Sequence, residues 1–278
     1  MYQKTVAARI SCRGEALHFG GEVEMSLAPA PPDTGLVFCR LDLPGRPTVT
    51  ASPTAVVDTR RAVALGQDGW RINTVEHLLA AAHGLGIDNL LVEVDGPELP
   101  MGDGSARYFV DLILRAGVVS QERPRRVRVV EEPLWAAEDG SYLVLLPSER
   151  PGLTVNYVFT ADRRPIPTQY CRFHLGEDDF TAAIAPARTI AFLEEIEALR
   201  REGLARSNDC TVAVVVGPEG YLGPLRFPDE IARHKVLDLL GDLYLVGPVY
   251  GQVLAVRSGH RLNHRLAQRL AALPAVVV

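Results

Sequence analysis

Short runs of alternating apolar and polar residues, which predict strands, are interleaved along this chain with longer runs at helical spacing. Residues 6–29 alternate on both sides of Gly20-Gly21 and predict two strands joined by a turn. The same patterns predict, in chain order, a helix over 77–84, a strand over 89–96, a helix over 106–117, paired strands within 127–148, a strand over 152–159, a helix of about four turns within 180–203, a buried strand over 210–216, a helix over 228–241, a strand over 251–259 and a closing helix over 262–273.

The ends of these helices are predicted from capping residues. Asn73 is placed to cap the first helix, with Glu76 three residues later as its capping-box partner. Glycines are expected to end the helices, namely Gly84 or Gly86 in the first, Gly203 in the third and Gly241 in the fourth. The basic, proline-containing stretch 121–126 is typical of a linker and separates two halves.

The two halves are alike in outline, because each contains strands and then a helix that begins near a histidine and is followed by a strand. This order predicts an α+β fold of two similar domains from a duplication, each with helices packed on a β-sheet. We expect the first domain over residues 1–121 and the second over 126–278. A site formed between them would lie at a domain interface, where active sites are common.

Composition narrows the classes of function. The net charge of −5 argues against general attraction to nucleic acid. No apolar run of about 18 residues predicts a membrane span, and the N-terminus lacks the apolar run of a signal peptide. The four cysteines form no Cys-x-x-Cys pair, which excludes a zinc ribbon and fits a reducing cytoplasm.

A metal site is the most specific chemistry that the residues suggest. His234 and Asp238 are four apart in a predicted helix and therefore share a face. His77, with Glu76 beside it, offers a third ligand from a distant helix. Two histidines, one aspartate and a nearby glutamate match a hydrolytic zinc site, which has three protein ligands, an open position and a general base.

Each of these residues also has a purely structural interpretation. Glu76 can be a helix-capping residue, His77 a hydrogen-bonded core histidine, and His234 with Asp238 an ordinary ion pair one helical turn apart. Taken together, however, the residues have complementary roles. Glu76 can take a proton from the attacking water, and a protonated His260 can stabilise the oxyanion or protonate the leaving amine.

Three further residues complete this hypothesis. Asp242 can orient His260 and keep it charged, and Thr189 can donate a hydrogen bond to the tetrahedral oxyanion. Lys235 can meet a phosphate or sugar oxygen of the substrate.

The chain resembles the UDP-3-O-acyl-N-acetylglucosamine deacetylases, zinc amidases of lipid A biosynthesis, over nearly its whole length. The matching motifs stand in the order of the family, namely VVDTR at 56–60, TVEHLLAA at 74–81, GLGIDN at 84–89, VEVDGPELP at 92–100, DGSA at 103–106, APART at 185–189, FPDEIARHKVLDLLGDLYL at 227–245 and SGH at 258–260.

The resemblance implies hydrolysis of the 2-acetamido group of a UDP-linked acylated glucosamine, which releases acetate and a free amine. It places Zn²⁺ on His77, His234 and Asp238, although Fe²⁺ also suits these ligands. It implies the following other roles: Glu76 as the base, His260 as charged partner or general acid, Asp242 as its support, Thr189 at the oxyanion, and Lys235, Phe192 and His18 at the substrate. A cytoplasmic monomer is expected.

The chain departs from the family pattern mainly around the substrate. The positions concerned are Phe19, Val63, Ala64, Ile190, Ala205 and Arg206, which add bulk or remove hydroxyls. Three interpretations therefore stay open, namely the lipid A deacetylase with an altered pocket, a paralogue that cleaves another acylamide, and a metal-binding scaffold without activity. The leucines at 262, 266, 270 and 273 share one helix face, which predicts core packing or, alternatively, weak membrane contact.

Overall fold

The computed structural model describes residues 1–16, 18–161, 165–196 and 212–278. A five-stranded sheet in the first half has the order β2-β3-β9-β4-β5. Its strands are β2 (Ile10–Glu15), β3 (Glu22–Pro29), β4 (Leu36–Arg40), β5 (Thr48–Thr50) and β9 (Leu90–Val94). The central strand β9 pairs antiparallel with β3 and parallel with β4.

A seven-stranded sheet forms most of the second half. Its strands are β11 (Arg126–Val129), β12 (Leu134–Glu138), β13 (Ser141–Leu146), β14 (Leu153–Phe159), β15 (Gln169–Leu175), β19 (Val249–Val256) and β20 (Ala275–Val277). The central strand β19 pairs antiparallel with β13 and parallel with β14. Five of these strands therefore follow the order β12-β13-β19-β14-β15, which repeats the first sheet strand for strand. This repeat supports a duplication, which stays a prediction, as do the two domain boundaries.

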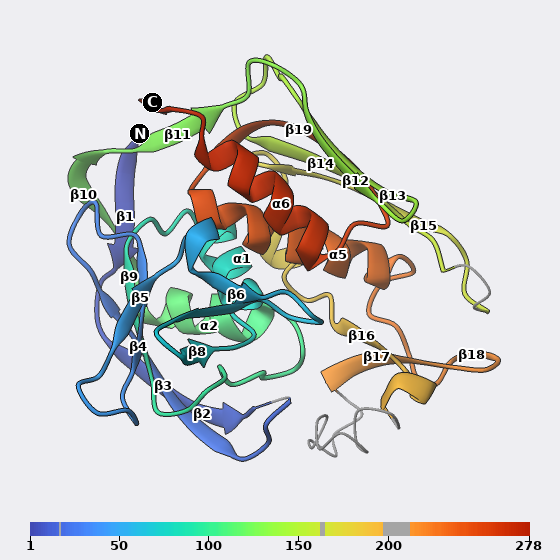
Figure 1. The fold of residues 1–278 in the computed structure, drawn as a ribbon, viewed down its shortest axis with the longest axis horizontal. Helices are drawn as coiled ribbons and strands as arrows, with labels where there is room; N and C mark the ends of the chain where they lie inside the picture. The colour runs from blue at the N-terminus through green and yellow to red at the C-terminus, as the bar shows by residue number, and fades with distance from the viewer. Residues whose placement is uncertain (17, 162–164, 197–211) are drawn as a thin grey trace.

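The helices with both ends among the described residues are α1 (Glu76–Leu85), α2 (Arg107–Ala116), α3 (Phe180–Ala183), α5 (Glu230–Leu243) and α6 (His260–Ala271). The 3₁₀ turns η1 (Pro53–Ala55) and η3 (Tyr244–Val246) accompany them. Helices α1 and α5 pack against each other in the middle of the molecule, between the two sheets (Figure 1). The apolar faces of the helices and both sheets share one continuous core. The predicted α+β class, with helices packed on sheet, is confirmed.

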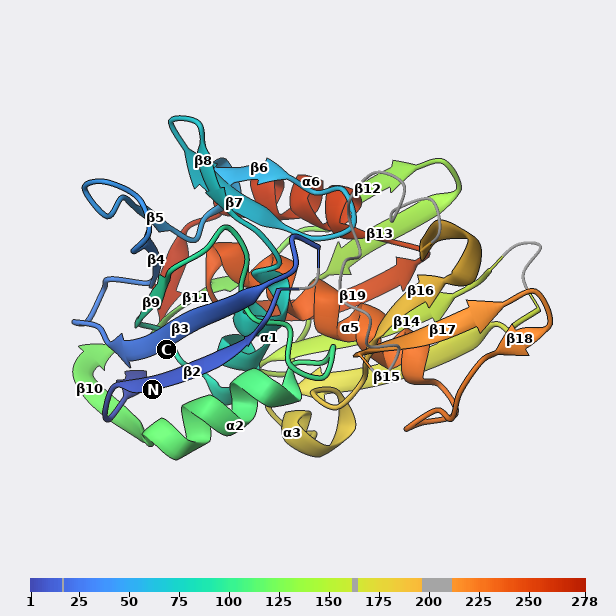
Figure 2. The same cartoon turned by 90° about the horizontal axis from the view of Figure 1, so that it is seen from below.

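Three small sheets surround this core. They are β1 (Tyr2–Val6) with β10 (Val118–Pro124), β6 (Val56–Asp58) with β7 (Ala64–Gln67) and β8 (Trp70–Ile72), and β16 (Thr189–Phe192) with β17 (Ala213–Gly217) and β18 (Gly220–Tyr221). The β16–β18 sheet lies beside α5, on the side away from β1 and β10 (Figure 2). Strands β16 and β17 pair in parallel.

Several local predictions are wrong for identifiable reasons. Asn73 does not cap α1, because its side chain donates to the Pro97 carbonyl oxygen and Val75 is the N-cap residue. The expected linker at 121–126 is part of β10 and β11, since β10 pairs with the N-terminal strand β1. Within 180–203, the short helix α3 is followed by strand β16, and helical residues resume only at 193. The expected end of that helix at Gly203 lies outside the described residues.

The leucine face of the closing helix α6 packs into the core. Leu262, Leu266 and Leu270 are buried in the core, and Leu273 packs against it. The core-packing interpretation of this face is therefore confirmed, and weak membrane contact elsewhere stays a prediction. Within the described ranges, none of the helices is both long and apolar enough to span a bilayer.

Gly241 does not end α5, as the sequence had suggested, but lies inside it at the closest approach to α1. A Cβ atom at this position would stand 2.1 Å from the carbonyl oxygen of Glu76. Alanine normally stabilises a helix relative to glycine by about 1 kcal/mol. Here the clash with α1 opposes that gain, because backbone cannot move aside as a flexible side chain does.

We expect Gly241→Ala to lower the free energy of unfolding by about 1–3 kcal/mol, as measured by urea denaturation. Gly223→Ala is the matched control, since a Cβ there meets nothing within 4 Å. Equal stability of the wild type and Gly241→Ala would show that α1 and α5 are not held this closely.

Candidate active site

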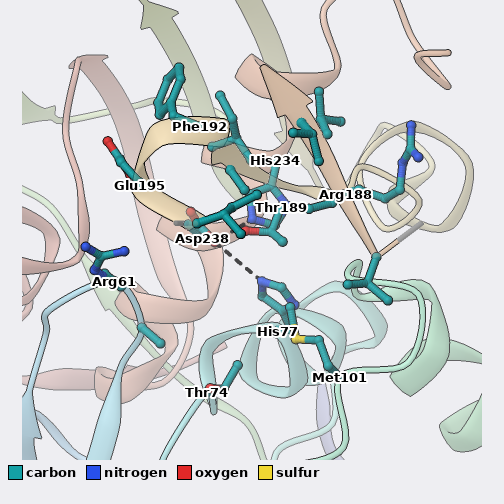
Figure 3. A pocket seen from close by; sticks show the side chains of 18 of the residues that line it. Arg61, Thr74, His77, Met101, Arg188, Thr189, Phe192, Glu195, His234 and Asp238 are labelled. Carbon is teal, nitrogen blue, oxygen red and sulfur yellow. Dashed lines mark ion pairs between the residues drawn. The ribbon is translucent and has the colours of Figure 1, made fainter. Parts of the chain in front are cut away.

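Three possible metal ligands converge from α1 and α5. The Nε2 atom of His234 lies 3.3 Å from Oδ1 of Asp238, one helical turn away, and Nε2 of His77 lies 3.7 Å from the same oxygen. One ligand atom from each residue lies within 4.8 Å of the others, and all three residues are buried. Figure 3 shows His77 of α1 pointing toward Asp238 and His234 of α5. This convergence depends on the close packing of the two helices.

The hydrogen bonds and charges of these residues fit a bound cation. Nδ1 of His234 bonds to the Ala187 carbonyl oxygen over 3.0 Å, which leaves Nε2 to face Asp238. Oδ1 of Asp238 is buried without a hydrogen-bond partner among the described residues, as expected of an oxygen that a cation would satisfy.

The protonation states fit a cation as well. Burial, and secondarily the neighbouring His234, lower the pKa of His77 to about 3, so its ring is neutral. Burial opposes ionisation of Asp238, but His234 and Lys235 hold its pKa well below the usual range. A neutral imidazole and an ionised carboxylate are the forms that ligate a metal ion.

Glu76 precedes His77 and is buried at the start of α1. Burial raises the pKa of its carboxyl to about 7, and His260 partly offsets that rise. Its Oε2 accepts a hydrogen bond from the Val63 backbone nitrogen over 2.9 Å. A carboxyl of this pKa beside the candidate ligands can exchange a proton near neutral pH.

His260 begins α6 and is paired with a buried carboxylate. Its Nδ1 lies 2.9 Å from Oδ2 of Asp242, which also accepts from the Asn263 side chain over 2.8 Å. Burial alone would lower the pKa of His260, but the charges of Asp242 and Asp238 raise it to about 10. The imidazole is therefore protonated at neutral pH and donates to Asp242.

Lys235 stands beside the candidate ligands and is paired with one of them, Asp238. Its Nζ donates to Oδ2 of Asp238 over 2.7 Å. Burial would lower the pKa of Lys235, but the charge of Asp238 raises it above its ordinary value. The lysine thus neutralises the carboxylate oxygen that does not face the two histidines.

A pocket of about 680 Å³ opens over this centre. Its walls include every predicted site residue except Asp242, which lies behind His260: the lining contains Glu76, His77, Thr189, Phe192, His234, Lys235, Asp238, His260 and His18. Strands β16 and β17 supply an apolar wall, visible in Figure 3 beside Phe192. Two arginines, Arg61 and Arg188, add positive charge to the lining.

The sequence comparisons identify the family. A profile of the family described as UDP-3-O-acyl N-acetylglycosamine deacetylase matches residues 3–272. The chain belongs to this family.

Curated relatives agree with this membership. The chain is 42% identical over 275 residues to the UDP-3-O-acyl-N-acetylglucosamine deacetylase of Myxococcus xanthus (strain DK1622). This alignment covers 98% of this chain and 87% of the relative. It is 44% identical over 275 residues to the protein of that name from Anaeromyxobacter sp. (strain Fw109-5), with 98% and 89% covered. The relative from Chromobacterium violaceum is 40% identical over 276 residues, with 98% and 91% covered. The predicted resemblance is confirmed.

The departures from the deacetylase pattern fall in different places. Ile190 lines the pocket, whereas Val63 and Ala64 are buried outside its lining, with the Val63 nitrogen bonded to Glu76. Phe19 is exposed to 36%. Ala205 and Arg206 lie outside the described residues.

Two buried glutamates near the site, Glu98 and Glu230, are not among the predicted site residues. Glu98 accepts hydrogen bonds from the backbone of His18 and from the Thr74 hydroxyl, so it joins the loop before β3 to the residues before α1. Glu230 accepts from Arg188. Both glutamates lie inside matched motifs of the deacetylase family, and that position is the signal that could have identified them.

Proposed function

We propose that this protein is a metal-dependent amide hydrolase that removes the 2-N-acetyl group of UDP-3-O-(3-hydroxyacyl)-N-acetylglucosamine in lipid A biosynthesis. The observation that carries the proposal is the convergence of His77, His234 and Asp238 beside the buried Glu76. The curated relatives are named for this deacetylation and match almost the whole chain.

We infer that His77, His234 and Asp238 hold Zn²⁺, with Fe²⁺ as the alternative, because two imidazoles and a carboxylate suit both ions. A bound divalent cation supplies a Lewis acid that acidifies water and polarises the amide carbonyl. Lys235 supports the centre by holding the second oxygen of Asp238.

The other site residues have complementary roles in the proposed reaction. Glu76 accepts the proton of the water that attacks the acetamide carbonyl. The imidazolium of His260, held by Asp242, stabilises the developing oxyanion or protonates the leaving amine. The Thr189 hydroxyl donates to the same oxyanion from the start of β16. Acetate and the free amine of the sugar are the products.

The pocket lining supports a substrate with both an apolar and an anionic part. The apolar wall, which includes Ile190 and Phe192, suits an acyl chain, and Arg61 suits a diphosphate. The family resemblance implies His18 and Phe192 as substrate contacts, and both line the pocket.

A substrate panel tests the proposal. Acetate release is measured from the acylated UDP-N-acetylglucosamine, from UDP-N-acetylglucosamine and from N-acetylglucosamine. We expect kcat/KM for the acylated substrate to exceed kcat/KM for UDP-N-acetylglucosamine at least about a hundredfold, because the buried acyl chain contributes binding energy. Activity on a different acylamide alone would favour the divergent paralogue, and inertness toward all with metal bound would favour the scaffold.

We also propose a cytoplasmic monomer. The described cysteines, Cys12, Cys39 and Cys171, are free thiols, which suits a reducing compartment.

The pH dependence of kcat/KM should be bell-shaped. Glu76 must be ionised to act as a base, so activity falls as pH drops through its pKa of about 7, or lower because a bound cation favours the carboxylate. His260 must be protonated, so activity falls as pH rises through about 10.

Asp242→Asn should move only the basic limb of this profile, to lower pH by roughly one to three pH units, because it removes the charge that raises the pKa of His260. A basic limb that stays in place in this variant would exclude His260 as the group that titrates there.

A further inference from the structure

A buried carboxylate stands at the start of α5, one turn before His234. Glu230 is 0% exposed. Its Oε1 accepts from the backbone nitrogen and Nε of Arg188 over 3.1 and 2.9 Å. Its Oε2 accepts from Nη2 of Arg188 over 3.2 Å and from the backbone nitrogen of Arg226 over 2.6 Å. Four donors therefore converge on one side chain that does not line the pocket.

Three of the four donors belong to Arg188, in the short stretch that leads into β16, here called segment 185–189. Other residues of segment 185–189 are also held by hydrogen bonds. The Pro186 carbonyl oxygen accepts from Nη1 of Arg226 over 2.8 Å. The Ala187 carbonyl oxygen meets Nδ1 of His234 over 3.0 Å. The Thr189 nitrogen donates to the Gly104 carbonyl oxygen over 2.8 Å. Segment 185–189 is thus tied to the same helix that carries two of the candidate ligands.

Arg188 lines the pocket but is largely committed to protein partners. Its Nε and Nη2 atoms bind Glu230, and Nη2 also donates to the Pro224 carbonyl oxygen over 2.8 Å. The pair is shielded from water, with side chains 12% and 0% exposed. A buried ion pair is weak evidence for stability, because desolvation offsets most of the attraction. A role in geometry accounts better for a hub of this kind.

We propose that Glu230 is a positioning residue, which fixes segment 185–189 against α5 so that the Thr189 hydroxyl stands at a set place relative to His234. This inference rests on the proposed function, because it concerns the oxyanion of that reaction. Catalytic donors act when they are already placed where charge develops, and an error of about 1 Å can cost about a hundredfold in rate.

The test compares Glu230→Gln with Asp229→Asn. Asp229 is the neighbouring acid at the start of α5, and it pairs with Arg233 over 2.7 Å instead of with segment 185–189. Both substitutions remove one negative charge from the same helix end. We expect Glu230→Gln to lower kcat about ten- to a hundredfold with KM within about threefold of wild type. Asp229→Asn should leave both within about twofold. Thermal unfolding and metal content per chain are recorded for each protein.

A double substitution separates positioning from other roles. If Glu230 acts through Thr189, then Glu230→Gln should slow the Thr189→Ala enzyme by no more than about twofold. Losses that multiply in the double variant, a rise in KM with kcat unchanged, or metal loss in proportion to kcat would each overturn the inference. A wild type without deacetylase activity would instead remove the proposed function itself.

Arg226→Met is the second variant, for use if Glu230→Gln does not fold. The Arg226 side chain is 34% exposed, so this substitution disturbs the core less than Glu230→Gln does. It still removes the hydrogen bond to the Pro186 carbonyl oxygen. We expect a several-fold lower kcat that is again absent in the Thr189→Ala background. An unchanged kcat in a folded Arg226→Met enzyme would contradict the fastening of segment 185–189.

Discussion

Glu76→Ala is expected to lower kcat for acetate release about a thousandfold while the enzyme keeps its metal. General-base catalysis contributes about 10²–10⁴ to rates, and the raised pKa of about 7 places this carboxyl in the range where a base is most effective. Glu76 is not one of the three residues whose ligand atoms converge, so its loss should leave metal content unchanged. The measurement is single-substrate kinetics with metal analysis of the same samples.

Glu76→Gln sharpens this test. The amide oxygen can still accept from the Val63 nitrogen, so the start of α1 keeps its local bond, but the side chain can no longer take up a proton. We expect the same loss of kcat as in Glu76→Ala. Retention of more than about a tenth of wild-type kcat in either variant would assign the base to another group.

His234→Ala should abolish both metal binding and turnover. The substitution removes one of the three candidate ligands and also the contact between α5 and the Ala187 carbonyl oxygen. Metal content should fall from about one ion per chain to a small fraction of that. Turnover should fall about a thousandfold or more, in keeping with the several kcal/mol that a bound metal contributes.

His264→Ala is the matched control. This histidine lies on α6, where Nε2 bonds to the Pro53 carbonyl oxygen over 2.8 Å, and it is not among the converging ligands. The metal content and kcat of His264→Ala should equal those of the wild type. A strong chelator should inactivate the wild type, and Zn²⁺ or Fe²⁺ should restore it. Normal metal content in His234→Ala would place the metal elsewhere.

The sequence predicted elements best where one face of a strand or helix carries the signal. The hairpin around Gly20-Gly21 and the helix that ends before Gly86 are present because alternation and glycine caps are local. Strand β16 is absent from the prediction, since the run from Thr189 onward continues into helical spacing and its pairing partner β17 begins only at Ala213. The prediction of a linker at β10 is wrong because the partner strand β1 is more than a hundred residues away, so the sequence around β10 does not reveal the pairing.

The candidate site was likewise predictable from the sequence only in part. The spacing of His234 and Asp238 predicted a shared face, and His77 beside Glu76 suggested the distant third ligand, which the resemblance also implies. The bond from Val63 to Glu76 and the four donors on Glu230 could not be predicted, because hydrogen bonds between distant segments leave no periodic pattern. The capping box failed for a related reason: the Asn73 amide binds Pro97, a residue of another loop.

The most direct test of the central claim is a time course of both products with the metal-loaded protein and UDP-3-O-(3-hydroxyacyl)-N-acetylglucosamine. We expect acetate and the free 2-amine of the sugar to appear in equal amounts, and Glu76→Ala, with its metal bound, to form both about a thousandfold more slowly. A folded wild-type protein that holds its metal and releases no acetate from this substrate would contradict the account.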